Sequence, residues 1–171
     1  MTEHTNQAET KTYPNMLVLA ANNELLGYGL DFGGYGVKEQ KIALTSLWRA
    51  IDGDEAYIVK QEVYSDIGVS ELGIYLLLKG DNKPVIVDFA EAHAIAVLKR
   101  LGINVVKCNK APGSIEATNT LINSLKVAIT SDSADMVAIK PCKQHYKVLR
   151  EDGGLMDAMR YSFQILNNSK E

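Results

Sequence analysis

Short apolar segments with strand-like spacing fill the first part of the chain. They lie at residues 25–32, 42–51 and 56–64. The last two are separated by a turn that contains Asp52-Gly53, a pair typical of tight hairpins. The pattern therefore predicts a three-stranded antiparallel meander.

From residue 70 onward, helical and strand-like spacing alternate. A helix is predicted to begin at the capping residue Ser70 and to end before Gly80, and Gly102 is predicted to end the next one. A strand, helix and strand in succession require a right-handed parallel crossover. The predicted helices are 70–79, 90–101, 114–124 and 154–166, the predicted strands are 85–88 and 104–108, residues 126–130 are short and β-like, and residues 133–139 are helical up to Pro141.

The chain of 171 residues has the composition of one globular domain, with 46% hydrophobic and 23% charged residues. Residues 1–12 are polar and have nothing to bury, and the apolar residues 16–20 are too few for more than an edge element. We predict that residues 1–22 are a flexible tail or linker remnant and that residues 23–171 form the domain.

Charge and cysteine content exclude several classes of protein. A net charge of -3 and a pI of about 5.7 argue against a constitutive nucleic-acid coat protein, although a local basic groove is compatible with them. Cys108 and Cys142 form no zinc-binding pattern, so reduced thiols are expected. Because no segment has the length of a membrane span or the character of a signal peptide, we expect a cytoplasmic protein with no membrane partner.

Two predicted strands end in an aspartate, Asp31 and Asp88. An Asx-type turn is a sufficient explanation of either residue alone. Neighbouring strands are about 4.8 Å apart, however, so two such carboxylates could share a divalent cation. Both interpretations stay open at this point.

The order of elements predicts an α/β, ribonuclease H-like fold: a five-stranded mixed sheet, three strands antiparallel and then two parallel, flanked by helices. In that topology the first and fourth strands are neighbours, and the last helix can add Asp157 to Asp31 and Asp88. Two like charges about 4 Å apart repel by about 4 kcal/mol at an effective dielectric of about 20, so protonation or cations must relieve them. A pair of Mg²⁺ or Mn²⁺ ions could activate water and stabilise the leaving oxygen of a phosphodiester.

Several short motifs occur in a recognisable order. They are Tyr28-Gly29-Leu30-Asp31-Phe32-Gly33, Asp88-Phe89-Ala90-Glu91-Ala92-His93-Ala94-Ile95, Leu101-Gly102-Ile103-Asn104-Val105, Lys110-Ala111-Pro112-Gly113-Ser114-Ile115 and Asp157-Ala158-Met159-Arg160-Tyr161. With these motifs, residues 28–163 resemble the C-terminal nuclease domain of the large terminase subunit of tailed double-stranded DNA bacteriophages.

The resemblance implies a metal-dependent endonuclease that cuts concatemeric double-stranded DNA during genome packaging. It implies Asp31, Asp88 and Asp157 as catalytic metal ligands, and a terminase ATPase domain, a portal and a small terminase subunit as partners. The sequence contains no phosphate-binding loop of its own. Gly154 stands where many members have a histidine, so we expect two Mg²⁺ or Mn²⁺ ions, of which one is weakly held without DNA.

Three lysines are candidate DNA contacts. Lys110 precedes a loop that enters a helix, a position suited to phosphate. Lys143 and Lys147 belong to a basic stretch that could follow a DNA backbone, although a solvated helix face explains them equally well. Glu91 has a metal-site interpretation and a helix-dipole interpretation, and it is left out of the catalytic set.

Two alternatives to the packaging nuclease remain. One is another ribonuclease H-like nuclease, such as a Holliday-junction resolvase. The other is a catalytically vestigial docking module of the packaging motor. For the favoured function we expect an Asp→Asn change at each of the three acids to abolish cleavage while leaving the fold intact or more stable, because each change removes a repelling charge.

Overall fold

The computed structural model describes residues 21–33, 41–51, 56–65, 67–79, 81–130 and 154–168. Most of the predicted tail, the turn at 52–55 and the predicted helix at 133–139 lie outside these residues.

The described strands form one six-stranded sheet in the order β5-β4-β1-β2-β3-β6. Strands β1, β2 and β3 are antiparallel, whereas β4 and β5 run parallel to β1. The predicted fold class is confirmed, with one strand more than the five expected: the short β-like segment pairs in parallel with β3. The strands are β1 (Asn23–Asp31), β2 (Lys41–Ala50), β3 (Ala56–Ser65), β4 (Val85–Val87), β5 (Val105–Lys107) and β6 (Lys126–Ile129).

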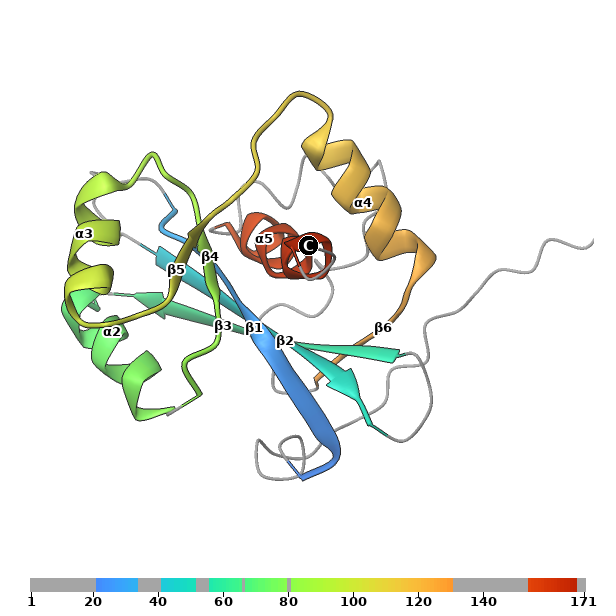
Figure 1. The fold of residues 1–171 in the computed structure, drawn as a ribbon, viewed down its shortest axis with the longest axis horizontal. Helices are drawn as coiled ribbons and strands as arrows, with labels where there is room; N and C mark the ends of the chain where they lie inside the picture. The colour runs from blue at the N-terminus through green and yellow to red at the C-terminus, as the bar shows by residue number, and fades with distance from the viewer. Residues whose placement is uncertain are drawn as a thin grey trace, which may run out of the picture.

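Helices cover both faces of this sheet (Figure 1). On one face, α2 (Val69–Leu78) and α3 (Ala92–Arg100) pack on apolar side chains of β1, among them Tyr28 and Leu30. On the other face lie α4 (Ser114–Ser124) and α5 (Leu155–Asn168), with Phe163 of α5 buried. The chain is therefore built as three layers.

The start of α2 differs from the prediction. Gly68, and not Ser70, is the N-cap of α2, and its N–H donates to the Glu71 carboxylate (2.8 Å). Gly113 caps α4 with φ +80°, so Ser114 is its first helical residue. Glycine suits this position because the left-handed region costs it little. Gly102 follows α3 with φ +85° and donates to the carbonyl of Lys99 (3.0 Å), which confirms the predicted end of that helix.

At alternate positions that face α5, strand β1 has Gly27, Gly29 and Asp31, and Leu26 packs on the same helix where the strand register shifts. A Cβ atom at Gly29 would overlap the carbonyl oxygen of Ala158 and the backbone nitrogen of Ser162. Ala158 and Ser162 are one helical turn apart, so a stripe of small residues on α5 lies on the glycines of β1. The helix backbone therefore rests directly on the strand backbone.

Helix α5 is buried almost all round. Every residue from Leu155 to Ile165 is buried except Asp157, which is partly exposed. A helix in the middle of a core has little reason to keep a carboxylate unless the carboxylate serves a site. The burial pattern therefore singles out Asp157.

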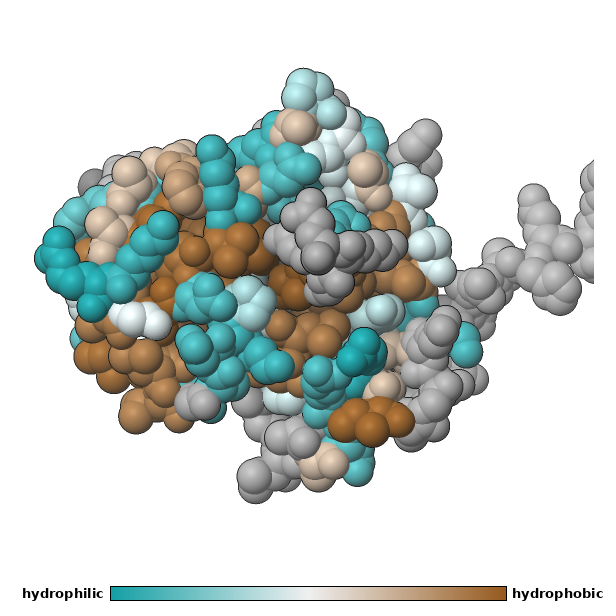
Figure 2. Space-filling view, viewed as in Figure 1, coloured by the Kyte–Doolittle hydropathy of each residue, from teal (hydrophilic) through white to brown (hydrophobic). Residues whose placement is uncertain are grey.

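Apolar side chains reach the surface mainly over α2, as Figure 2 shows at its lower left. Ile74, Leu77 and Leu78 are the exposed residues there. Among the described residues, no helix combines the length and the apolar character needed to cross a membrane.

Gly29→Ala tests the contact between α5 and β1. The added methyl group has no room beside Ala158, so we expect the free energy of unfolding to fall by about 1–3 kcal/mol or more. Urea denaturation followed by circular dichroism measures it. Gly68→Ala is the matched control: its φ of -75° suits alanine and a Cβ there would meet Glu71 at an ordinary 3.4 Å, so a change below about 1 kcal/mol is expected. Equal losses in the two variants would contradict the close contact.

Candidate active site

Asp31 and Asp88 lie side by side at the ends of two neighbouring parallel strands. The register pairs Leu30 of β1 with Val87 of β4, and each aspartate is the next residue. Both carboxylates close a turn in the same way, since the Gly33 N–H donates to Asp31 Oδ2 (3.2 Å) and the Ala90 N–H donates to Asp88 Oδ1 (3.0 Å). The Asx-turn interpretation is confirmed for both residues, and it brings both carboxylates to the same edge of the sheet.

The start of α5 lies directly against Asp31. Gly154 precedes the helix, and its carbonyl accepts from the Ala158 N–H (2.8 Å). A Cβ atom at Gly154 would overlap Asp31 Oδ2, and the φ of +81° also disfavours any side chain there. A histidine at position 154 would therefore need a different local backbone and a displaced Asp31 side chain.

Burial is the main reason why the pKa of Asp31 rises to about 6. The negative charges of Asp157 and Asp88 raise it further, while the Gly33 N–H and the Lys110 ammonium act in the opposite direction. The three predicted acids are thus close enough for their charges to interact. The ionised form of Asp31 is therefore disfavoured.

Asp88 forms an ion pair with Lys110. Burial by itself raises the pKa of Asp88, but the hydrogen bonds from Lys110 and from the Ala90 N–H outweigh it and leave the pKa below its usual value. The side chain of Lys110 is 54% exposed and that of Asp88 is 18% exposed, so the pair lies at the surface of the site. Lys110, predicted as a DNA contact, therefore also neutralises an acid.

Asp157 accepts a hydrogen bond from the guanidinium of Arg160, one turn further along α5. Arg160 is only 7% exposed. The simple pairing of Arg160 with an acid is the interpretation that the structure supports. Two of the three carboxylates thus have a cationic partner from this chain.

The loop that carries Lys110 is fastened to α5. The Asn109 N–H donates to the side-chain oxygen of Gln164 (2.7 Å), and the Gln164 amide donates to the Asn109 carbonyl (3.0 Å). Asn109 also accepts from the Ala111 N–H through its side chain (2.9 Å). Sequence analysis missed Gln164, since no local pattern relates two residues 55 positions apart.

The donor chemistry of this site fits Mg²⁺ or Mn²⁺, because carboxylates from β1, β4 and α5 are near enough for their charges to interact and the ionised form of Asp31 is disfavoured. In the part of the chain that the structure describes, no three ligating side chains are close enough together to hold an ion. Asp88 instead contacts Lys110, and Asp157 contacts Arg160.

The other candidates from the sequence contribute less. Lys143 and Lys147 lie outside the described residues. Glu91 is at the N-cap of α3 without a side-chain capping bond, and His93 is exposed. Cys108 is buried and is not part of a disulfide.

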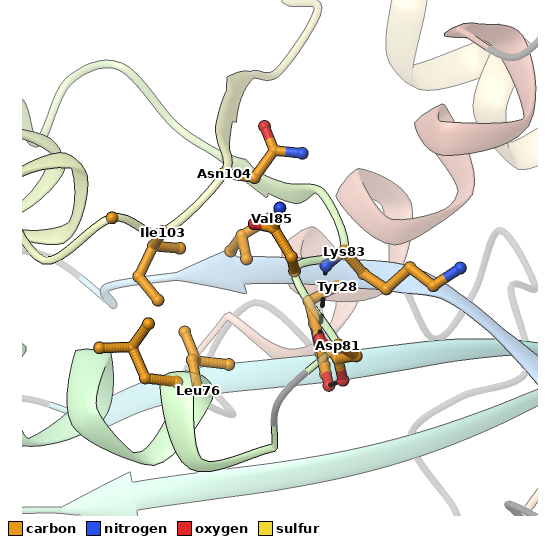
Figure 3. Close-up of a pocket in the computed structure, with 10 residues that line it drawn as sticks. Tyr28, Leu76, Asp81, Lys83, Val85, Ile103 and Asn104 are labelled. Atoms are coloured by element: carbon orange, nitrogen blue, oxygen red, sulfur yellow. Dashed lines mark hydrogen bonds between the residues drawn. The ribbon is translucent and has the colours of Figure 1, made fainter.

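A cavity of about 370 Å³ lies at the opposite end of β4 (Figure 3). It is lined by Leu76, Ile103 and Val85, and Tyr28 donates to Asp81 there (2.6 Å). Lys83 extends away from this hydrogen bond in Figure 3. None of the three acids lines the cavity, so the carboxyl ends of β1 and β4 are the better candidate for chemistry.

Comparison with known proteins supports the fold. No protein-family profile matches the sequence, and a search of curated proteins finds no significant match. Among solved structures, the chain is similar to the nuclease domain of the large terminase g2p from bacteriophage SPP1, crystallised with bound Mn (TM-score 0.65, 20% identity, 91% of this chain and 94% of that chain). It is also similar to the large terminase of a thermophilic bacteriophage (TM-score 0.53, 22% identity), where 91% of this chain matches 41% of the other. The fold is thus that of a large-terminase nuclease domain.

Asp31→Asn tests the electrostatics of the site. The folded pKa of about 6 exceeds the unfolded value of about 3.9, so the wild type loses stability as the pH rises through this window and does not regain it above. In metal-free buffer at neutral pH, we expect the asparagine variant to be more stable by about 1–3 kcal/mol, with no difference near pH 4. Urea denaturation across the pH range measures it.

Asp88→Asn is the control. The lowered pKa of Asp88 means that its charge stabilises the fold at neutral pH, and this contribution disappears as the pH falls through the folded pKa. We therefore revise the expectation for this acid to a loss of less than about 1 kcal/mol, since the pair is partly exposed. A gain at neutral pH from Asp88→Asn, or none from Asp31→Asn, would contradict this distribution of charge.

Proposed function

We propose that this protein is a metal-dependent DNA endonuclease of a viral genome-packaging motor. The observation that supports the proposal is that burial, together with the charges of Asp157 and Asp88, raises the pKa of Asp31 to about 6 at the carboxyl end of β1. A fold like that of two phage large terminases supports it.

Asp31, Asp88 and Asp157 would hold the divalent ions. When bound, Mg²⁺ or Mn²⁺ supplies a nucleophilic water and neutralises the leaving oxygen of the phosphodiester. We propose two ions, one of them weakly held until a DNA phosphate completes its ligands. The SPP1 domain crystallised with Mn is a precedent for the choice of metal.

Side chains of this protein prepare the site for a cation. Asp31 is ionised at neutral pH, yet its charge is disfavoured, so it gains more from a cation than an exposed aspartate would. Asp88 must exchange Lys110 for the ion, which leaves the ammonium available to a phosphate oxygen. Arg160 keeps Asp157 oriented from a buried position.

The proposed substrate is concatemeric double-stranded DNA, cut in the cytoplasm of an infected host. The proposed partners are a terminase ATPase domain, a portal and a small terminase subunit. These assignments follow from the resemblance of the sequence motifs to large-terminase nuclease domains, and the fold shared with two phage large terminases is consistent with them.

The chief alternative is a docking module without catalysis. The pairing of Asp88 with Lys110 and of Asp157 with Arg160 favours it, because both acids have protein partners in place of a metal. A third candidate, a junction resolvase, would share the acids and differ in substrate.

Cleavage of a circular plasmid tests the proposal. We expect nicked and linear products with Mn²⁺ or Mg²⁺ and none with EDTA, because the carboxylates act through the metal. Asp31→Asn, Asp88→Asn and Asp157→Asn should each lower the rate by at least about 100-fold, measured by gel electrophoresis. Glu116→Gln, a change in an exposed acid of α4, is the matched control and should cleave as the wild type does.

The outcomes separate the three candidates. No cleavage with either metal by the wild type would favour the docking module. A strong preference for synthetic four-way junctions over plasmid would favour the resolvase. Full activity in any one of the aspartate variants would remove that residue from the site.

Lys110→Ala tests the second role of this lysine. If the ammonium contacts a phosphate, the slope of log affinity against log salt concentration for duplex DNA should become shallower by about one. Filter binding at a fixed low Mg²⁺ concentration and several salt concentrations measures it, in an Asp157→Asn background that lowers cleavage and leaves Asp31 and Asp88 to hold an ion. Lys126→Ala, on the far edge strand, should keep the wild-type slope, and an unchanged slope for Lys110→Ala would restrict this residue to pairing with Asp88.

A further inference from the structure

Phe89 is an exposed aromatic residue next to the candidate active site. It directly follows Asp88, and 39% of its surface is accessible, whereas most large apolar residues of the described chain are buried. A single exposed apolar residue is common on protein surfaces, so a binding role is inferred from its place beside Asp88 and from the charges around the ring.

The ammonium groups of two lysines lie over this ring. The ammonium of Lys107, at the end of β5, is 4.9 Å from the ring centroid, and that of Lys99, in the last turn of α3, is 5.7 Å away. Both side chains are exposed, and neither forms an ion pair with a carboxylate of the described residues. Cation–π attraction accounts for their approach to the ring, and two ammonium groups so placed also favour an anion between them.

An exposed aromatic ring with cations nearby is the arrangement that binds single-stranded nucleic acid, and here a base reaches the ring when the two long lysine side chains turn from the ring face toward the phosphates. Bases stack on the ring, and the ammonium groups hold the phosphates of the same strand. A base inside a duplex has both faces covered by its neighbours, so Phe89 gains a stacking contact only where a base is unpaired. The position beside Asp88 would bring such a base close to the bond to be cut.

We propose that Phe89, Lys99 and Lys107 form a single-strand platform, which stacks an unpaired base of the DNA substrate beside the active site. The biological role of the platform depends on the proposed nuclease function. Its binding property follows from the ring and the two lysines alone. The enzyme therefore prefers DNA that is frayed or locally melted next to the cleavage site.

Binding in EDTA tests the platform without cleavage. Fluorescence anisotropy compares a labelled short single strand with a blunt duplex of the same sequence. Phe89→Ala should weaken single-strand binding by roughly 5- to 100-fold and change duplex binding by less than about twofold, because only the single strand offers a base face. Phe89→Trp should bind the single strand at least as tightly as the wild type.

A strand containing 2-aminopurine reports stacking directly. The wild type should quench its fluorescence on binding, and Phe89→Leu, which keeps an apolar side chain without a π face, should lose that quenching. Leu78→Ala, at an apolar position of α2 that is 81% exposed, is the control and should behave as the wild type in both measurements.

The lysines are tested by the salt dependence of single-strand binding. Lys99→Gln and Lys107→Gln should each make the slope shallower by about 0.7, and Lys126→Gln should not change it. An affinity of Phe89→Ala within about twofold of the wild type, or equal losses for single strand and duplex, would overturn the platform. A competing acidic peptide would also overturn the platform. If such a peptide displaces the single strand and Phe89→Ala weakens its binding equally, the patch is a protein-docking surface.

The two proposals fail separately. If Phe89→Ala leaves binding unchanged while the plasmid is cleaved with Mn²⁺, the platform falls and the nuclease stands. If the single-strand effects appear and no metal supports cleavage, the platform stands as a binding surface and the nuclease falls.

Discussion

The backbone-to-backbone contact between α5 and β1 is the constraint on which the rest of the structure depends. Gly29 leaves no atom between the strand and Ala158, so the helix axis lies as close to the sheet as sterics permit. This closeness brings the start of α5 onto Asp31 and sets Asp157 beside the ends of β1 and β4. A single methyl group on the strand would separate the acids as surely as it would disturb the core.

Three carboxylates at one point of a partly buried edge carry a large electrostatic cost, and the chain relieves it unevenly. Lys110 neutralises Asp88 and Arg160 neutralises Asp157, while the pKa of Asp31 stays high. The uncompensated negative charge is therefore concentrated at Asp31, and a divalent cation bound there would neutralise it. The charge of Asp31 lowers the stability of the fold, and a ligand bound at this residue could restore that stability.

Much of this could be predicted from the sequence because the signals are local. Alternating apolar residues and glycine stops located the strands and helices, and strand order then made Asp31 and Asp88 neighbours. Side-chain contacts between residues far apart in the sequence could not be predicted in this way. Lys110 contacts Asp88 across 22 residues, and Gln164 contacts Asn109 across 55. The fit of Gly29 to Ala158 had a visible signal, since glycines two apart in a strand match small residues four apart in a helix, but only the fold shows which helix meets which strand. Phe89 was passed over because exposure cannot be read from a motif.

The position of α5 has a consequence for how the protein is made. Strand β1 is the first strand of the described sheet to be synthesised and α5 is the last described helix, yet each completes the other's packing. Until the ribosome has released α5, the sheet exposes the apolar face that this helix later covers, and the nascent chain depends on chaperones or speed to avoid aggregation. The acids also stay apart during this interval. The proposed nuclease would be harmless to nucleic acid until this helix has been made and docked.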